Sequence, residues 1–393
     1  MKITINIIRI LVGLLFIFSG LVKANDPLGL SYKMQEFFEL WKMTQFNDYT
    51  LWFSIIIIAF EIIAGFALLL GWGMRLFSWL LLLLIIFFTF LTGYAYLSGK
   101  FKNCGCFGDC IPISTFTSFI KDLALLGMIL ILFAYRNKIK PLFSNKVNVG
   151  LMMLVTLLSF GIQWYALQHL PYIDCLPYKT GNNISDKRKP PPGAKPDVYD
   201  TKMIYHKDGK RYEFTAADLP SDWKTYTYDT TIIKLVKKGN MEPAIKGFYL
   251  SGNTNIDSTD IILAQPFCVI LFAENFSTSA TKWKNEFEKI YADARQKKIP
   301  VYLVATSIDE AAGVIAGTPF AGVPIFKCDF TAIRTAARAN PTLYLLNHGT
   351  VEGKWSYADF DKANDKLEKI PVQEILRKES TDQSKDTSKP PPQ

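Results

Sequence analysis

The chain has 393 residues, which is enough for two or three domains. Hydrophobic residues make up 49% of it, and the mean hydropathy of +0.14 is high for a soluble protein. The apolar residues are concentrated before residue 170, so the simplest interpretation is a membrane part followed by a soluble part. The formal net charge is +9, but the lysines are spread over many loops. This spread excludes a nucleic-acid partner and favours contact with lipid headgroups.

Five apolar segments are each close to the roughly 20 residues that cross a hydrocarbon core. The first follows Lys2 and must be considered as a signal peptide, but it contains Arg9 and lacks a small-x-small cleavage site. We therefore expect the chain to retain it as a span. The segments are Ile3–Val22, Leu51–Leu70, Leu76–Leu97, Phe119–Tyr135 and Val147–Leu167.

The charges of the loops predict how these spans are oriented. Residues 136–146 contain four basic residues and no acidic one, which predicts a cytoplasmic loop. The turn at Arg75 and the N-terminus then also lie in the cytoplasm, whereas the connector 24–50 and everything after residue 168 lie outside. We expect a protein of the bacterial inner membrane with a periplasmic C-terminal domain, in a compartment that permits disulfides.

The part beyond the spans is predicted to consist of several smaller units. Residues 171–200 contain the proline-rich run Lys189–Pro196 and are expected to form a spacer. Short alternating stretches predict a small β region over 201–262. Strands that alternate with helices over 263–377 predict an α/β layer fold, and the polar tail 378–393 is expected to be disordered.

Three of the six cysteines, Cys104, Cys106 and Cys110, lie close together between the third and fourth apolar segments. Positive charge from Lys23 and Lys121 would stabilise thiolates there. The functional interpretation is a redox-active set that exchanges electrons with a partner, and the alternatives are a structural disulfide and a metal site. A metal site is disfavoured because all three histidines lie far along the chain and no second cysteine pair has zinc spacing.

Cys175 lies just beyond the fifth apolar segment, so it should reach the same membrane surface as the cysteine loop. We predict that its sulfur lies near the loop, either bonded to one of the loop thiols or poised for exchange; the alternative is a free or lipid-facing thiol. Within the loop, a bond from either earlier cysteine to Cys110 is geometrically easier than one between those two. Cys268 and Cys328 occupy apolar strands, where core packing is the expected role.

Ionisable residues inside apolar segments are costly and are therefore functional candidates. Glu61 lies near the middle of the second segment, at a depth that Arg9 of the first segment should reach. The pair is interpreted either as a structural ion pair between two helices, or as a proton path or quinone headgroup contact that serves the thiols. Lys121 and Asp122, at the outer start of the fourth segment, are interpreted as an interfacial pair rather than a catalyst.

The membrane part carries Arg9 with Gly13, the run Phe18–Lys23, and the run Glu61–Gly65 with Gly71. In these features it resembles the DoxX family of small membrane proteins, and its Cys-x-Cys loop makes it similar to the branch that includes the methylamine-utilisation protein MauE. The resemblance implies a four-helix membrane domain over residues 1–146, to which a fifth helix over 147–170 is added. It also implies an association with thiol and sulfur redox chemistry and with quinones, so a quinone is the cofactor that it suggests.

Residues 262–370 show strands and helices in alternation, and Asn340-Pro341-Thr342 precedes a hairpin. This order resembles a thioredoxin fold and implies a cis peptide bond before Pro341. The chain departs from that family after the strand that ends at Ala273, because Glu274–Ser279 stand where a Cys-x-x-Cys is expected. Without those thiols, the domain is expected to bind or hold a partner.

These features favour a membrane-embedded thiol–disulfide redox protein at the outer face, in which Cys104, Cys106 and Cys110 pass electrons to or from a protein partner or a quinone. The competing interpretation is a non-enzymatic membrane anchor or assembly factor whose thioredoxin-like domain is a binding module. The expected partners are membrane lipid and a protein on the periplasmic side. Trapping the redox state of the loop thiols would separate the two interpretations.

Overall fold

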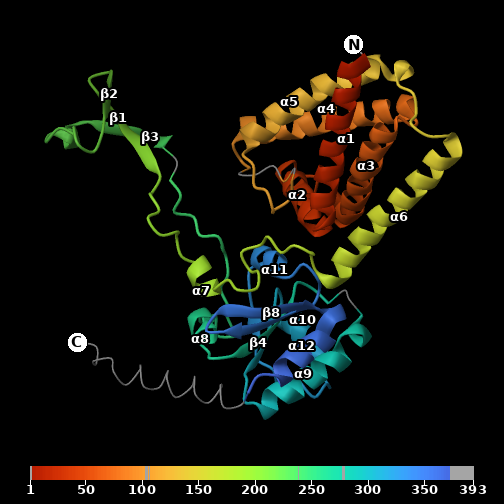
Figure 1. Ribbon diagram of the computed structural model, residues 1–393. Coiled ribbons are helices and arrows are strands. Elements are labelled where there is room, and N and C mark those ends of the chain that lie inside the picture. Colours follow the sequence, from red (N-terminus) through yellow and green to blue (C-terminus); the bar gives the residue numbers. More distant parts are fainter. Residues whose placement is uncertain (1, 102–104, 106, 238, 277–278, 372–393) are drawn as a thin grey trace.

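The computed structural model describes residues 2–101, 105, 107–237, 239–276 and 279–371. Figure 1 shows a helical bundle, an α/β region below it, and a three-stranded sheet that projects to one side. The predictions for Cys104, Cys106 and the tail 378–393 fall outside the described residues.

Among the described residues, five helices are long and apolar enough to cross a membrane, which confirms the predicted number of spans. The fourth begins at Thr115, ahead of the predicted start, because Ser114 caps it: the Ser114 Oγ accepts a hydrogen bond from the Thr117 amide at 3.1 Å. The five helices are α1 Lys2–Ala24, α3 Thr50–Leu70, α4 Met74–Ser98, α5 Thr115–Ala134 and α6 Asn145–His169.

The connector between the first two spans folds as helix α2, Pro27–Leu40, followed by the 3-10 helix Thr44–Tyr49. Asp26 caps α2, since its Oδ1 accepts a hydrogen bond from the Gly29 amide at 3.0 Å. Pro27 suits the first turn, where a missing amide hydrogen costs nothing. In Figure 1, α2 lies at the end of the bundle that faces the α/β region.

Helices α1 and α3 run antiparallel and touch at their backbones. A Cβ atom on Gly65 would lie 2.7 Å from the carbonyl oxygen of Gly13 and 2.8 Å from Cγ1 of Ile17. Small residues at such positions let membrane helices approach closely. The contact fixes which turn of α1 faces which turn of α3, and therefore which polar side chains meet inside the bundle.

The α/β region combines five strands in one sheet with helices on both faces. Its elements in chain order are α7 Ile184–Lys187, α8 Thr259–Leu263, β4 Cys268–Ala273, α9 Lys284–Gln296, β5 Val301–Ala305, α10 Ile308–Ile315, β6 Ile325–Lys327, α11 Phe330–Ala336, β7 Thr342–Asn347, β8 Thr350–Ser356 and α12 Phe360–Glu368. The strand order is β6-β5-β4-β7-β8, with β4, β5 and β6 parallel and the pairs β4–β7 and β7–β8 antiparallel.

Alternate side chains of β4 point into two separate cores, as the pleat of a strand requires. Val269 and Leu271 join a core with α9, α10 and α12, whereas Ile270 and Phe272 join a core with α8 and α11. Both faces of the central strand are therefore covered, which explains its uninterrupted apolar sequence.

Two features of this region bear on the sequence predictions. The Asn340–Pro341 peptide bond, between α11 and β7, is cis as predicted. Tyr178 and Ile184 are buried in the same core as α8 and α11. The spacer is therefore shorter than 171–200, because part of that segment supplies apolar surface to the sheet.

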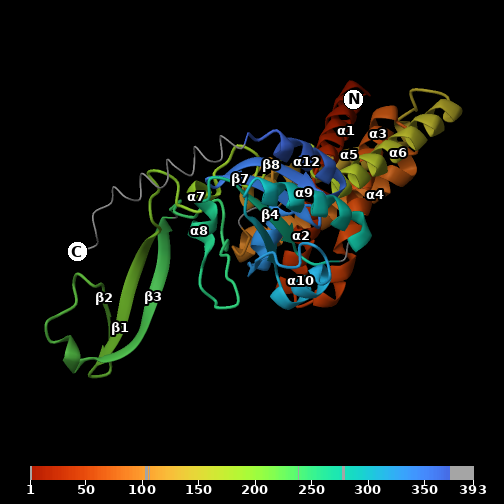
Figure 2. The ribbon, with the colours of Figure 1, turned by 90° about the horizontal axis from the view of Figure 1, so that it is seen from below.

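The three-stranded sheet has the antiparallel order β2-β1-β3, built from β1 Val198–Lys207, β2 Lys210–Phe214 and β3 Thr227–Lys237. It projects away from the other two parts in both views (Figures 1 and 2). The β structure predicted over 201–262 is thus confined to the first part of that range, since Phe248 and Leu250 are buried in the core of the α/β region.

Candidate functional site

The cysteine loop and the segment after α6 are joined by a disulfide between Cys110 and Cys175. Their Cα atoms lie 4.9 Å apart, and both residues are partly exposed. This confirms the prediction that Cys175 lies at the loop and bonds to one of its thiols. The redox role of the pair stays a prediction.

Arg338 of the α/β region reaches the aspartate that precedes Cys110. Its Nη2 bonds Asp109 Oδ2 at 2.8 Å, and its Nε bonds Asp26 Oδ2 at 2.8 Å. The arginine side chain is only 5% exposed. Burial lowers the pKa of Arg338, but the carboxylates of Asp26 and Asp109 more than offset this, so the guanidinium stays charged. A buried cation of one region thus pairs with two carboxylates of the other.

Lys354 of β8 reaches the aspartate that precedes Cys175. Its Nζ bonds Asp174 Oδ2 at 3.0 Å, and its side chain is 3% exposed. Burial lowers the pKa of Lys354, and Asp174 opposes that shift only in part. The neighbouring Ile173 is held to the outer end of α1 by two hydrogen bonds with the Asn25 side chain, each of 2.9 Å. Both halves of the disulfide are therefore held between the bundle and the α/β region.

A second group of contacts lies at the end of β4. Glu274 accepts a hydrogen bond from Arg334 Nε at 2.8 Å and another from the Tyr32 hydroxyl at 3.4 Å. Arg334 also bonds Gln35 of α2. Burial, together with the charge of Glu274, raises the pKa of Tyr32. The residue that follows β4 thus binds the membrane part of the same chain through α2.

A cleft of about 930 Å³ opens between α2, the cysteine loop and α11. Its walls include Cys175 and Asp109, together with Arg334 and Arg338 of the α/β region. Because a half-cystine lines an open cleft, a thiol from another molecule has a route to the disulfide.

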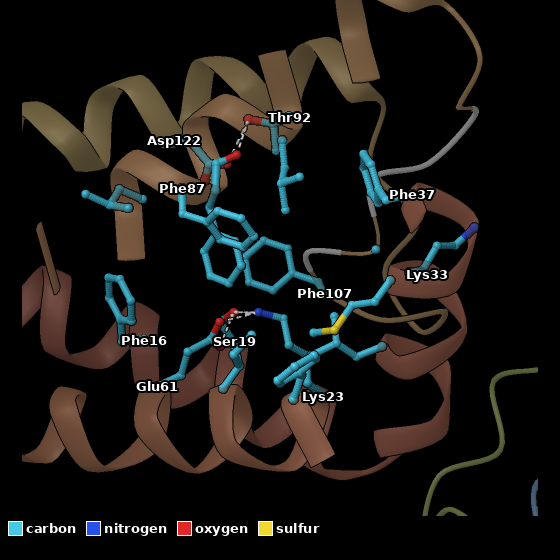
Figure 3. A pocket seen from close by; sticks show the side chains of 18 of the residues that line it. Phe16, Ser19, Lys23, Lys33, Phe37, Glu61, Phe87, Thr92, Phe107 and Asp122 are labelled. Carbon is cyan, nitrogen blue, oxygen red and sulfur yellow. Dashed lines mark hydrogen bonds and ion pairs between the residues drawn. The ribbon is translucent and has the colours of Figure 1, made fainter. Parts of the chain in front are cut away.

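A second cavity, of about 420 Å³, lies inside the bundle and has mainly apolar walls (Figure 3). Glu61 sits on one wall, 1% exposed, and accepts hydrogen bonds from Lys23 Nζ at 2.5 Å and from Ser19 Oγ at 3.0 Å. The lysine predicted to support the thiols is therefore the partner of the intramembrane carboxylate.

The predicted pair of Arg9 and Glu61 is wrong. The α1–α3 register places Arg9 Nη1 beside Gly71, where a Cβ would lie 2.8 Å from it, and the Nε of Arg9 has no hydrogen-bond partner. Glu61 lies almost three helical turns before Gly71 along α3. Counting depth from the ends of the segments could not reveal this, because it ignores which turns the close helix contact brings together.

The opposite wall of the cavity carries a similar group. Asp122 accepts a hydrogen bond from Thr92 at 3.1 Å and pairs with Lys121 at 2.7 Å, which confirms the predicted Lys121–Asp122 pair. Figure 3 shows Phe107 of the cysteine loop reaching between the two walls, and its ring centroid lies 5.0 Å from Lys121 Nζ. The loop that carries Cys110 therefore also lines the cavity. Ser19 and Thr92 were missed, although a hydroxyl within an apolar span is the signal that marks them.

The other two described thiols are buried in the α/β region. Cys268 and Cys328 are 1% and 4% exposed and unbonded. Burial raises the pKa of Cys268 to about 12 and that of Cys328 to about 11. The prediction that they pack in the core is confirmed. Within the described residues no group of three or more His, Cys, Asp or Glu side chains is arranged to hold a metal ion.

Comparison with known proteins gives matches to parts of the chain. Residues 1–135 match the family described as methylamine utilisation protein MauE, which agrees with the resemblance of the cysteine loop. Residues 199–238, the three-stranded sheet, match a domain of unknown function (DUF8463). Protein TlpB of Flavobacterium psychrophilum is 30% identical over 155 residues, which cover 39% of this chain and 42% of that protein. No solved structure matches.

Proposed function

We propose that this protein is a membrane-embedded thiol–disulfide exchange protein whose exchangeable bond is Cys110–Cys175. One observation carries the proposal: the Cys175 half of this disulfide lines an open cleft, whereas the two described thiols of the α/β region are buried and unbonded. In the exchange, a thiolate of a partner protein attacks the sulfur of Cys175, and Cys110 leaves as a thiolate. A second partner thiol then resolves the mixed disulfide. The partner becomes oxidised, and Cys110 and Cys175 become thiols.

The cavity in the bundle fits a quinone as the acceptor of these two electrons. Its walls are apolar, and Lys23 and Lys121 can donate hydrogen bonds to carbonyl oxygens. Lys23 pairs with Glu61 at 2.5 Å and Lys121 with Asp122 at 2.7 Å. A quinone bound there would take up two electrons and two protons from the Cys110 and Cys175 thiols, whose disulfide would form again. Phe107 links the cavity to that loop.

The proposed role of the α/β region is that of a thioredoxin-like domain that binds a partner and does not itself exchange disulfides. The parallel β4 and β5, the antiparallel hairpin β7–β8 and the position of Pro341 support this assignment. The region departs from the thioredoxin fold in one respect: β6, the strand that pairs with β5 at the edge of the sheet, comes after β5 in the chain. Glu274 opens the segment Glu274–Ser279, in which a Cys-x-x-Cys is expected, and it bonds Tyr32 and Arg334.

Trapping in cells tests the proposed exchange. Cys110→Ser leaves Cys175 as a free thiol, which can run the exchange in reverse by attacking the disulfide of an oxidised partner protein and releasing one partner thiolate. Because no Cys110 thiol is present to resolve it, the mixed disulfide between Cys175 and the partner should remain after acid quenching. The matched control is the same variant with Cys175→Ser added, which should lose that species. If the wild-type disulfide stays oxidised under every growth condition and no mixed species forms, the exchange proposal fails.

A second candidate function is a membrane-anchored assembly factor without redox turnover. The observation that favours it is the sequence Glu274–Ser279, which contains no cysteine where a Cys-x-x-Cys is expected. In that case Cys110–Cys175 is a static clamp, and a partner should co-purify with the Cys110→Ser variant through non-covalent contacts that withstand reducing agent.

The proposed location is the inner membrane of a bacterium, with the disulfide and the α/β region on the periplasmic side. The basic loop 136–146 lies at the opposite end of the bundle, where the Leu142 amide bonds the Leu70 carbonyl at 2.9 Å. Reporter fusions after residue 140 should therefore read cytoplasmic, and fusions after residue 180 should read external. A cytoplasmic signal at residue 180 contradicts this orientation.

A further inference from the structure

Each half of the disulfide is preceded by an aspartate, and each aspartate is held by a buried cation of the α/β region. Arg338 holds Asp109 beside Cys110, and Lys354 holds Asp174 beside Cys175. The bundle supplies the sulfurs and the acids, whereas the α/β region supplies both cations. No local sequence pattern requires this symmetry, because Arg338 and Lys354 lie far along the chain from both cysteines.

The charges around a disulfide affect its reduced state more than its oxidised state. The oxidised bond is neutral, but the reduced pair carries thiolate charge when the pH approaches the thiol pKa. A bare carboxylate next to a cysteine disfavours the thiolate, and a cation that neutralises the carboxylate removes that penalty. A stabilised thiolate makes the disulfide easier to reduce.

We propose that the α/β region, which has no exchangeable thiol among its described residues, sets the redox equilibrium of Cys110–Cys175 through Arg338 and Lys354. The two cations act as positioning residues: they neutralise Asp109 and Asp174 and so favour reduction of the disulfide. The inference rests on the proposed exchange at this bond. It assigns the α/β region a regulatory role in that exchange, since binding linkage requires that reduction and docking influence each other.

The contacts give Arg338 a stronger hold than a surface ion pair would. Besides Asp109 it bonds Asp26, and its Nη1 donates to the Arg334 carbonyl at 2.7 Å. These partners fix the guanidinium from both regions, so it remains at Asp109 while the sulfurs change state. Other charged side chains of the same cleft are Lys33, Glu36, Glu39, Lys179, Lys187 and Arg334. These six side chains stay unchanged in all the variants that test the inference.

The test is a pair of variants that break the same contact from opposite sides. Arg338→Gln leaves Asp109 unneutralised and should make the disulfide harder to reduce. Asp109→Asn leaves Arg338 in place without this carboxylate and should make it easier to reduce. If Arg338 merely held the two regions together, both variants would shift the equilibrium in the same direction. The opposite signs therefore separate an electrostatic role from a structural one.

The measurement uses the full-length protein in detergent with Cys104→Ser and Cys106→Ser, so that one pair titrates. The reduced fraction of Cys110–Cys175 is measured at defined ratios of reduced and oxidised glutathione at pH 9. Each variant is compared at the same pH with the parent protein, which carries only the Cys104→Ser and Cys106→Ser changes. A shift of about one unit in the thiol pKa should change the equilibrium constant about three- to tenfold in each direction. A tenfold change corresponds to about 30 mV. At pH 6, where the reduced pair is protonated, the differences should almost vanish.

Arg338→Lys is the control for loss of folding, because it keeps the charge and loses the two-pronged geometry. It should stay closer to the parent than Arg338→Gln does. Lys354→Gln and Asp174→Asn repeat the comparison on the other sulfur, at pH 8 because burial lowers the pKa of Lys354. Shifts of equal sign within a pair, or no shift at pH 9, overturn the inference. The two tests fail separately: opposite shifts without a mixed disulfide would confirm the effect of the cations on the redox equilibrium and remove the exchange that they were proposed to regulate.

Discussion

The two main regions of the molecule each contain two described cysteines, and they use them in opposite ways. Cys110 and Cys175 are bonded and partly exposed, and Cys175 lies in the wall of a cleft. Cys268 and Cys328 are unbonded and enclosed by the cores of a covered sheet. Among the described cysteines, the accessible ones thus belong to the membrane part. The α/β region contributes the buried cations Arg338 and Lys354 instead.

The largest expected effect comes from removing the bond on the membrane side. Cys175→Ser should abolish the cross-link between peptides containing residues 110 and 175 in a non-reduced digest. It should also lower the free energy of unfolding by about 4 kcal/mol, since the bond closes a loop with a separation of 65 residues. Mass spectrometry and thermal unfolding in detergent measure both. Cys268→Ala is the control and should keep the cross-link. Loss of the cross-link in that variant would contradict the different roles assigned to the cysteines of the two regions.

The next effect concerns the carboxylate inside the bundle. Glu61→Gln leaves the Lys23 charge unpaired in an apolar cavity and should cost about 3 kcal/mol, seen as a lower melting temperature. Adding Lys23→Met to that variant should recover most of the loss. Adding Arg9→Gln instead should recover nothing, because Arg9 lies beside Gly71. Recovery by the arginine change would show that Arg9 and Glu61 interact after all.

The cysteines of the two regions should differ in their reactivity towards a thiol reagent in the folded protein. With pKa values raised to about 12 and about 11, Cys268 and Cys328 should react with maleimide at pH 8 at least about a hundredfold more slowly than a free cysteine. Cys110 and Cys175 should label after gentle reduction. Denaturant should make all of them reactive, which serves as the control. Fast labelling of Cys268 in the folded protein would mean that the α/β region exposes a usable thiol.

The smallest effect is expected at the end of β4. Glu274→Gln removes the ion pair with Arg334. The Arg334 side chain is 18% exposed and that of Glu274 is 14% exposed, so the free energy of unfolding should fall by no more than about 1 kcal/mol. Trapping of Cys175 should be unaffected. A loss of trapping in this variant would give the position after β4 a direct part in exchange, as in a thioredoxin that retains its thiols.

Much of the framework was predictable because it depends on local patterns. Runs of apolar residues identified the five spans, and the Cys175 position just beyond the last span predicted its proximity to the loop. The cis bond at Pro341 followed from the order of elements. The partner of Glu61 was not predictable, since it depends on the helix register set by the Gly13–Gly65 contact. Arg338 and Lys354 were not singled out either, because basic residues near strands are common and only the docking of two regions brings them to Asp109 and Asp174.

The 65-residue separation of the bonded cysteines also constrains the order of assembly. Cys110 enters the growing chain before α5, but its bonding partner follows α6. The bond can form only after the α5–α6 pair has been inserted and Cys175 has returned to the same side. Arg338 and Lys354 are synthesised later still, so Asp109 and Asp174 remain unneutralised through that interval. A nascent chain therefore passes through a stage in which the bond can form without the cations that the finished protein places around it.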